Sequence, residues 1–218
     1  MFRYRETIKN YFNYFYYNVN QTLKGHSKLN TCLKYQASIS LYEVTILEKE
    51  IFDVIHNRKS IRQFTNEQIS RADLQAIAEA ARATPTSVNL QTRTFTMVQN
   101  KILIQKLGVA LRTAIGHHDV NFYNADSLLL ISVPAGYPYS QIETGLAVQN
   151  AYLAATAFDL GTTWTDQIRN QCDNDQVRAV LREMKIPDSH ICWTVLPIGV
   201  PDSQPMAKER TEPITIIE

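Results

Sequence analysis

The chain has few glycines and no long apolar run, and these shortages exclude several classes of protein. Seven glycines scattered among 218 residues form neither the Gly-rich loop of dinucleotide-binding domains nor that of P-loop proteins. The Gly-x-Ser-x-Gly turn of many serine hydrolases is also missing. No apolar run approaches the roughly 20 residues that a membrane span needs, so no membrane partner is expected.

Cysteine and net charge are equally scarce. Cys32, Cys172 and Cys192 are too few and too irregularly spaced for a zinc site or a disulfide framework, so buried thiols in a reducing compartment are expected. The adjacent pair His117 and His118 lacks a helical ligand pattern, and no metal is expected. A net charge of +1 does not favour nucleic acid. The early Arg and Lys residues precede no continuous apolar segment, so we expect a cytoplasmic protein without a signal peptide.

Two parts of the chain differ in composition. Residues 1–47 open with a dense group of Phe and Tyr side chains, and such segments are seldom disordered. We expect an aromatic-rich helical extension that packs on the main body or on a second subunit, with a substrate lid as the alternative. Residues 48–218 are expected to form the main domain, which is long enough for a sizeable core.

Within residues 48–218, helical and strand patterns intermix. Apolar residues at helical spacing predict a helix that starts with a capping box at Ser70 and Asp73 and ends before Pro85. Helices are also predicted at 102–115, at 143–160 with Gly161 as its cap, and at 174–184. Strands are predicted at 94–98, 127–133 and 193–200. Because few βαβ units of regular length occur, the pattern favours an α+β fold over a doubly wound sheet.

Two basic clusters far apart in sequence can close on one phosphate group. The first cluster has Arg58, Lys59 and Arg62 within five residues, together with Ser60. The second consists of Lys208 and Arg210 near the end of the chain. Arginine offers a planar fork of donors and lysine a point charge. The alternative for a single basic cluster is a solvated surface.

Two polar segments complete the candidate site. The first, 85–91, has amides that both donate and accept hydrogen bonds, as the pyrimidine edge of a flavin would require; the alternative is an ordinary turn. The second, 161–167, offers a turn with backbone N–H groups; the alternative is a helix cap beside a core tryptophan. With the basic clusters, these segments indicate a nucleotide-like cofactor that is not an adenine dinucleotide.

In this order, the segments resemble the nitroreductase family of FMN-dependent flavoproteins over residues 49–218. Arg58-Lys59-Ser60-x-Arg62-x-Phe64 resembles the opening Arg-Arg-Ser-x-Arg-x-Phe pattern of the family, and 80–91 resembles its Ala-rich loop with Pro, Ser and Asn. The Ala-rich stretch 145–161 resembles its central helix. Leu196-Pro197-Ile198-Gly199 with Lys208 and Arg210 resembles its closing strand and phosphate-binding tail.

The resemblance implies a mixed, mostly antiparallel central sheet flanked by helices, in an intertwined homodimer with FMN at the interface. It implies NADH or NADPH as electron donor and a small electron-poor acceptor, such as a nitroaromatic, quinone or enone. No catalytic side chain is implied. The implied contacts with the flavin or its phosphate are made by Arg58, Lys59, Ser60, Arg62, Pro85, Thr86, Ser87, Asn89, Gln91, Thr165, Asp166, Gln167, Lys208 and Arg210.

The departures from the family pattern concern substrate choice. Thr92-Arg93 stands where the family usually has Pro-Trp, and Thr86 replaces the usual Ser. No clear counterpart of a further polar contact to the flavin is found in 116–124. A specialised flavoenzyme of the same fold, similar to a dehalogenase or dehydrogenase, is therefore an alternative. A flavin-binding protein without turnover is another.

Overall fold

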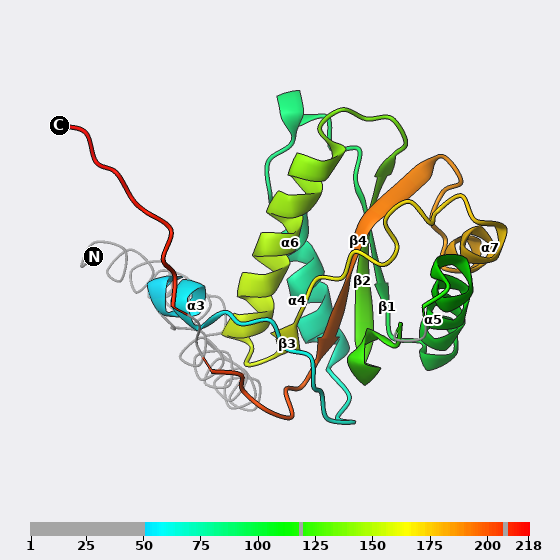
Figure 1. Ribbon diagram of the computed structural model, residues 1–218, viewed down its shortest axis with the longest axis horizontal. Helices are drawn as coiled ribbons and strands as arrows, with labels where there is room; N and C mark the ends of the chain where they lie inside the picture. Colours follow the sequence, from blue (N-terminus) through cyan, green and yellow to red (C-terminus); the bar gives the residue numbers. More distant parts are fainter. Residues whose placement is uncertain (1–50, 118–119, 207–208) are drawn as a thin grey trace, which may run out of the picture. The chain divides into compact units, whose positions relative to one another are not determined.

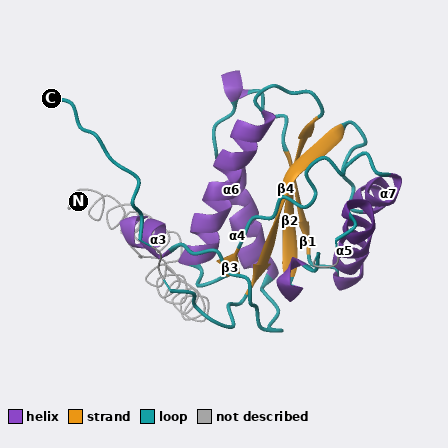
Figure 2. Cartoon of the chain, in the orientation of Figure 1, coloured by secondary structure: helices purple, strands orange, loops and turns teal. Residues whose placement is uncertain are grey.

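A computed structural model of the chain describes residues 51–117, 120–206 and 209–218. The predicted N-terminal extension, 1–47, lies outside these ranges, as do Cys32 and Lys208. Figure 1 shows the described part as a small sheet with helices on both sides, and Figure 2 shows the same view by secondary structure. In the part that the structure describes, no helix is both long and apolar enough to cross a membrane.

The sheet has the order β1-β2-β4-β3, and all its neighbouring strands are antiparallel. The strands are β1 (Thr94–Val98), β2 (Ser127–Pro134), β3 (Gly161–Thr162) and β4 (His190–Gly199). A parallel bridge between Ser60 and Thr162 adds one more backbone pairing at the edge. The predicted α+β fold with a mostly antiparallel sheet is therefore confirmed.

The two faces of the sheet carry separate apolar cores because side chains alternate along a strand. On β2, Leu128 and Leu130 pack toward α5 (Lys101–Ile115) and α7 (Asp175–Glu183). Leu129 and Ile131 pack toward α4 (Arg71–Arg82) and α6 (Ser140–Ala157) on the other face (Figure 1). Both faces of β2 are covered, which explains why its sequence is a continuous apolar run.

The predicted helix starts are largely confirmed. The Ser70 side chain accepts a hydrogen bond from the backbone N–H of Asp73 at 3.1 Å, as the capping pattern predicted. Asn100 and Asn174 cap α5 and α7 in the same way. The predicted end of the central helix is wrong. Helix α6 ends at Ala157, and Asp159 rather than Gly161 takes the left-handed conformation that closes it, with φ 58°.

Gly161 and Gly199 instead permit a close approach between chain segments. A Cβ atom on Gly161 would lie 2.8 Å from atoms of Ile61, and one on Gly199 would lie 2.6 Å from Phe64. The segment 60–65 passes directly over these glycines, with the N–H of Ile61 bonded to the carbonyl of Thr162 at 3.0 Å. The missing side chains therefore allow the segment with the basic residues to lie on the sheet.

Several apolar side chains remain exposed in the described part of the chain. They include Ile51, Phe52 and Ile55 of the short helix α3 (Ile51–Asn57), and Ile142 and Leu146 of α6. Residues 209–218 have no regular secondary structure, and Ile214, Ile216 and Ile217 there are exposed. A helix such as α6 that is apolar on more than one face is typical of a buried position.

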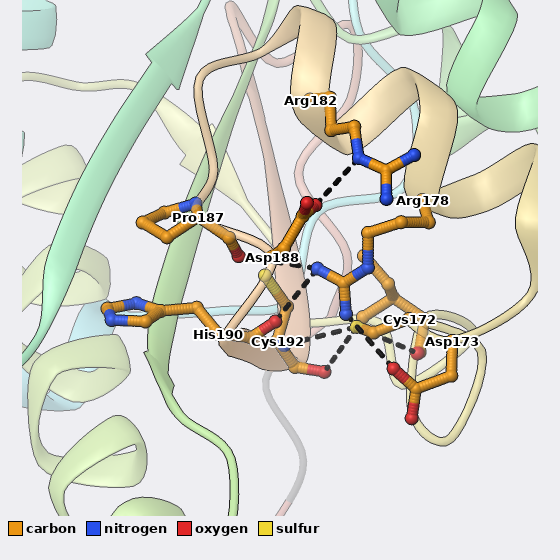
Figure 3. Close-up of polar contacts among 9 residues, drawn as sticks. Cys172, Asp173, Arg178, Arg182, Pro187, Asp188, His190 and Cys192 are labelled. Carbon is orange, nitrogen blue, oxygen red and sulfur yellow. Dashed lines mark hydrogen bonds and ion pairs between the residues drawn. The ribbon is translucent and has the colours of Figure 1, made fainter.

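Cys172 and Cys192 are both buried, as predicted, and lie in one polar cluster (Figure 3). The backbone N–H of Cys192 donates to Cys172 Sγ at 3.2 Å. Arg178, also buried, donates to the carbonyl of His190 at 3.0 Å and to Asp173 at 3.2 Å. The hydrogen bond from the Cys192 side chain lowers the pKa of Cys172 to about 7; the Cys192 N–H and Arg178 add to this effect, and burial opposes it.

This lowered pKa predicts a stability that depends on pH. Between pH 7 and 9 the unfolded chain retains the Cys172 proton while the folded chain releases it, so the free energy of unfolding rises with pH by on the order of 1 kcal/mol. This contribution to the free energy of unfolding is lost as the pH falls from 9 through about 7. Urea unfolding at pH 7, 8 and 9 measures the rise, and Cys172→Ser is expected to remove it. An equal rise in the serine variant would assign the effect to another group.

Candidate functional site

Tyr152 joins two of the predicted site segments. It lies in α6 with only 3% of its surface exposed, and its hydroxyl accepts a hydrogen bond from the backbone N–H of Trp164 at 2.7 Å. The same hydroxyl lies 3.5 Å from Ser60 Oγ, and the guanidinium carbon of Arg58 lies 5.2 Å from the centre of the Tyr152 ring. The structure therefore brings the basic cluster together with the 161–167 turn, through a tyrosine that the sequence reasoning missed.

Ile61 anchors the basic cluster of residues 58–62. Ile61 is buried, whereas Arg58, Lys59 and Ser60 are half-buried and Arg62 is exposed. Since neighbouring residues of an extended segment point to opposite sides, Arg58 and Ser60 share the Tyr152 side. Lys59 lines a separate pocket of about 260 Å³. The other residues that line this pocket are Asn57, Ile61, Thr156, Asp159, Leu160 and Gln204.

The end of the chain leaves the sheet beside the basic cluster. The N–H of Asp202 donates to the carbonyl of Gln63 at 3.0 Å, and Ser203 Oγ donates to Gln63 Oε1 at 2.7 Å. Arg210 is exposed and follows seven residues after Ser203. The tail thus starts at the right place for the predicted phosphate clamp, but closure of Lys208 and Arg210 on Arg58 stays a prediction.

The 161–167 turn provides fewer free N–H groups than expected. The N–H of Thr165 donates to the carbonyl of Val195 at 2.9 Å. This group is therefore not available to a cofactor, and the prediction that Thr165 offers a backbone N–H is wrong. The N–H groups of Asp166 and Gln167 form no hydrogen bond within the described ranges, and both remain candidates. The buried hydroxyls of Thr162 and Thr163 also lack a partner there.

The 85–91 loop lies at the other end of α6. The N–H of Ser87 donates to Oε1 of Glu143 at 2.8 Å, nine residues before Tyr152. Nine helical residues rise about 13 Å, so the structure does not bring this loop to Arg58 within one chain. Pro85, Asn89 and Gln91 are exposed and Thr86 is half-buried, and Asn89 has φ 58°. The Gln91 side-chain amide donates to Asn89 Oδ1 at 2.9 Å, so the two side chains are hydrogen-bonded to one another.

A buried polar cluster that the sequence reasoning did not predict supports the loop. Arg93 donates to Thr84 Oγ1 and to the Thr84 carbonyl, both at 2.7 Å, and to the carbonyl of Glu143 at 3.1 Å. Tyr137 donates to Glu143 Oε1 at 2.7 Å. Burial lowers the pKa of Arg93, and the charge of Glu143 opposes that change. Arg93 therefore acts in support of the loop, where the family usually has tryptophan.

A pocket of about 320 Å³ adjoins the 161–167 turn on the side of α6. Trp164 is 56% exposed beside it, and a Cβ atom on Gly145 would meet no atom within 4 Å. The pocket therefore has space for a small planar molecule next to the predicted flavin contacts. Its other lining residues are Gln141, Thr144, Val148, Asp166, Arg169, Trp193 and Thr194.

Two solved structures with this fold carry bound FMN. A nitroreductase with bound FMN from Bacteroides fragilis matches with a TM-score of 0.72 and 27% identity, over 78% of this chain and 100% of that one. A nitroreductase with bound FMN from Desulfitobacterium hafniense matches with a TM-score of 0.69 and 24% identity, over 78% and 99% of the two chains.

The amino-acid sequence is also similar to that of nitroreductases. A Methanothermobacter thermautotrophicus protein with the provisional name NADH dehydrogenase/NAD(P)H nitroreductase is 24% identical over 177 residues, which cover 77% of this chain and 86% of that protein. The model of the nitroreductase family matches residues 55–200, about two thirds of the 218-residue chain. This match includes the basic cluster, the loop and the turn. The chain belongs to the nitroreductase family.

Proposed function

We propose that the protein is an FMN-dependent oxidoreductase that passes electrons from NADH or NADPH to an electron-poor small molecule. The observation that carries the proposal is the junction at Tyr152, where Arg58 and Ser60 meet the 161–167 turn. This junction supports the proposal because Arg58 and Ser60, which would donate to a phosphate, lie close to the turn whose Asp166 and Gln167 N–H groups would face a ring. The FMN-bound relatives of the same fold support this choice of cofactor.

The residues present fit FMN by the chemistry of their donors. Arg58, Lys59 and Ser60 would hold the phosphate and ribityl chain, with Lys208 and Arg210 closing from the tail. Arg62 would lie near the pyrimidine edge, where a cation favours the reduced state. The unengaged N–H groups of Asp166 and Gln167 would orient the ring. The chemistry that bound FMN supplies is two-electron transfer from the nicotinamide to the acceptor.

The net reaction needs no acid or base side chain beyond exchange with solvent. For a nitroaromatic acceptor, NAD(P)H, one proton and the nitro compound give NAD(P)⁺, the nitroso compound and water. The role of this chain is to bind and orient both substrates in turn at one exposed ring face. A quinone or an enone would take the same hydride and proton.

We also propose a homodimer with the flavin at the interface, formed by the domain 48–218. Exposed Ile142 and Leu146 on α6 and the isoleucines of the tail give apolar area for a second subunit to cover. The 85–91 loop, far from Arg58 in its own chain, would reach the flavin of the partner through Pro85, Thr86, Ser87 and Asn89. Gln91 would support it.

An anaerobic absorbance titration tests the function. The purified protein is loaded with FMN and titrated with NADH and then with NADPH. Bleaching of the flavin band by one nicotinamide, with recovery on adding a quinone or nitroaromatic, is the expected result. Flavin that binds and stays oxidised would favour a flavin-binding protein without turnover or a specialised flavoenzyme. Absence of FMN binding would overturn the proposal.

Arg58→Gln is expected to weaken FMN binding at least tenfold, because charge-assisted hydrogen bonds to phosphate contribute roughly 1.5–3 kcal/mol. Quenching of FMN fluorescence measures the dissociation constant. Lys106→Gln is the matched control, since Lys106 is an exposed cation of α5 that pairs with Glu183 away from the site. Equal affinities in both variants would remove Arg58 from the phosphate site.

A further inference from the structure

Both tryptophans of the chain, Trp164 and Trp193, line the 320 Å³ pocket beside the 161–167 turn. Its volume lies in the range of roughly 300–1,000 Å³ that small-molecule sites occupy. The exposed Trp164 indole offers an aromatic face, and Gly145 leaves the α6 side open. The pocket therefore suits a planar ring, and it is separate from the residues proposed for the FMN phosphate.

Arg169 gives this pocket a positive charge with a defined position. Its guanidinium carbon lies 5.9 Å from the centre of the Trp193 ring. Asp166 also lines the pocket, but within the described part of the chain Arg169 forms no ion pair with it or with another carboxylate. A guanidinium that lies over an indole keeps its N–H edge available for a bidentate carboxylate.

We infer that this pocket selects the electron acceptor, and that the acceptor is a planar conjugated molecule with an anionic substituent such as a carboxylate or sulfonate. The ring lies against Trp164, and the anionic group is bound by Arg169. This inference rests on the proposed function, because the pocket adjoins the flavin only if Asp166 and Gln167 contact it. Arg169 is then a specificity-determining residue that contacts the substrate away from the reacting atoms.

Tryptophan fluorescence provides a direct binding test, because both indoles that emit lie in the pocket. The FMN-loaded protein is titrated with benzoate, benzamide and benzamidine, which share one ring and carry negative, neutral and positive groups. Benzoate is expected to bind at least ten times more tightly than the other two. Arg169→Gln should abolish this preference. The control Arg182→Gln, which removes an exposed α7 arginine paired with Asp188, should keep it.

Turnover gives a second readout that a purely structural role would not produce. Arg169→Gln is expected to raise the KM for 4-nitrobenzoate about tenfold with little change in kcat, and to leave both constants for 4-nitrobenzamide within about twofold. Such a split between KM and kcat, confined to the anionic acceptor, indicates binding of the carboxylate by Arg169.

Three outcomes would overturn the inference. Equal affinities for the three ring compounds would show that charge does not matter, and tightest binding of benzamidine would assign the pocket to Asp166. Weaker FMN binding in Arg169→Gln, with benzoate affinity unchanged, would show that the pocket belongs to the flavin. The proposed function fails separately, when neither nicotinamide bleaches the flavin although benzoate still quenches the indoles in an Arg169-dependent way.

Discussion

Gly199→Ala is expected to lower the free energy of unfolding by about 2–3 kcal/mol, the upper range for overpacking a tight site. The new Cβ atom would lie 2.6–2.9 Å from Cδ1, Cγ and Cβ of Phe64. Rotation of the ring cannot relieve the contact with Cβ, because that atom moves only with the backbone. Alanine otherwise fits a strand better than glycine, so the measured loss is a lower bound on the cost of the steric contact. Urea denaturation gives the value.

A matched control and a double variant make this result specific. Gly145→Ala, also in a regular element but with open space around the new methyl group, should stabilise the protein by about 0.5–1 kcal/mol through helix propensity. In a Phe64→Ala background, Gly199→Ala should cost less, because Cδ1 and Cγ, the two nearest of the three atoms, are gone. Equal losses with and without Phe64 would show that the glycine is needed for another reason.

Glu143→Ala is expected to destabilise the protein by about 3 kcal/mol. Glu143 is 3% exposed, and its carboxylate accepts hydrogen bonds from the Ser87 N–H and the Tyr137 hydroxyl. Removing it leaves both donors without their partner and the Arg93 guanidinium without the nearest negative charge. Native-state hydrogen exchange should show the Ser87 amide losing protection more than the amides of β2.

Two comparison variants separate this effect from a general loss of charge. Glu143→Gln keeps an acceptor oxygen and should cost about half as much. Glu79→Ala removes an exposed α4 carboxylate that pairs with Arg82, and should change stability by less than about 0.5 kcal/mol. If Glu143→Ala proves as mild as Glu79→Ala, the cluster does not hold the loop.

Local signals in the sequence predicted most helices and strands of the fold. Ser70 with Asp73 set the start of α4, and the apolar run before Pro134 set β2. The end of α6 was wrong because Asp159 takes a left-handed conformation that glycine usually occupies, and no residue pattern distinguishes that case. Gly161 has its own role, which depends on Ile61, a residue 100 positions earlier.

The candidate site was predicted in its segments but not in its contacts. Tyr152, Arg93 and Glu143 act through partners that are distant in sequence: Tyr152 contacts Ser60, and Glu143 contacts both Ser87 and Arg93. The Thr165 N–H could be assigned only from its pairing with Val195, 30 residues further along. A single sequence carries periodicity and cap signals, but it does not say which distant polar groups satisfy one another.

The strand order has a consequence for the time at which the protein folds during synthesis. β4 is the last strand of the chain, yet it lies between β2 and β3. Until the ribosome has made residues 190–199, the apolar β2 lacks its main partner and β3 lacks its partner strand, β4. The basic segment also cannot complete its hydrogen bonds before then, because the Thr65 N–H donates to the carbonyl of Val200. A nascent chain that has not yet reached residue 190 therefore leaves one edge of the apolar β2 unpaired, and the cofactor site forms only once β4 is in place.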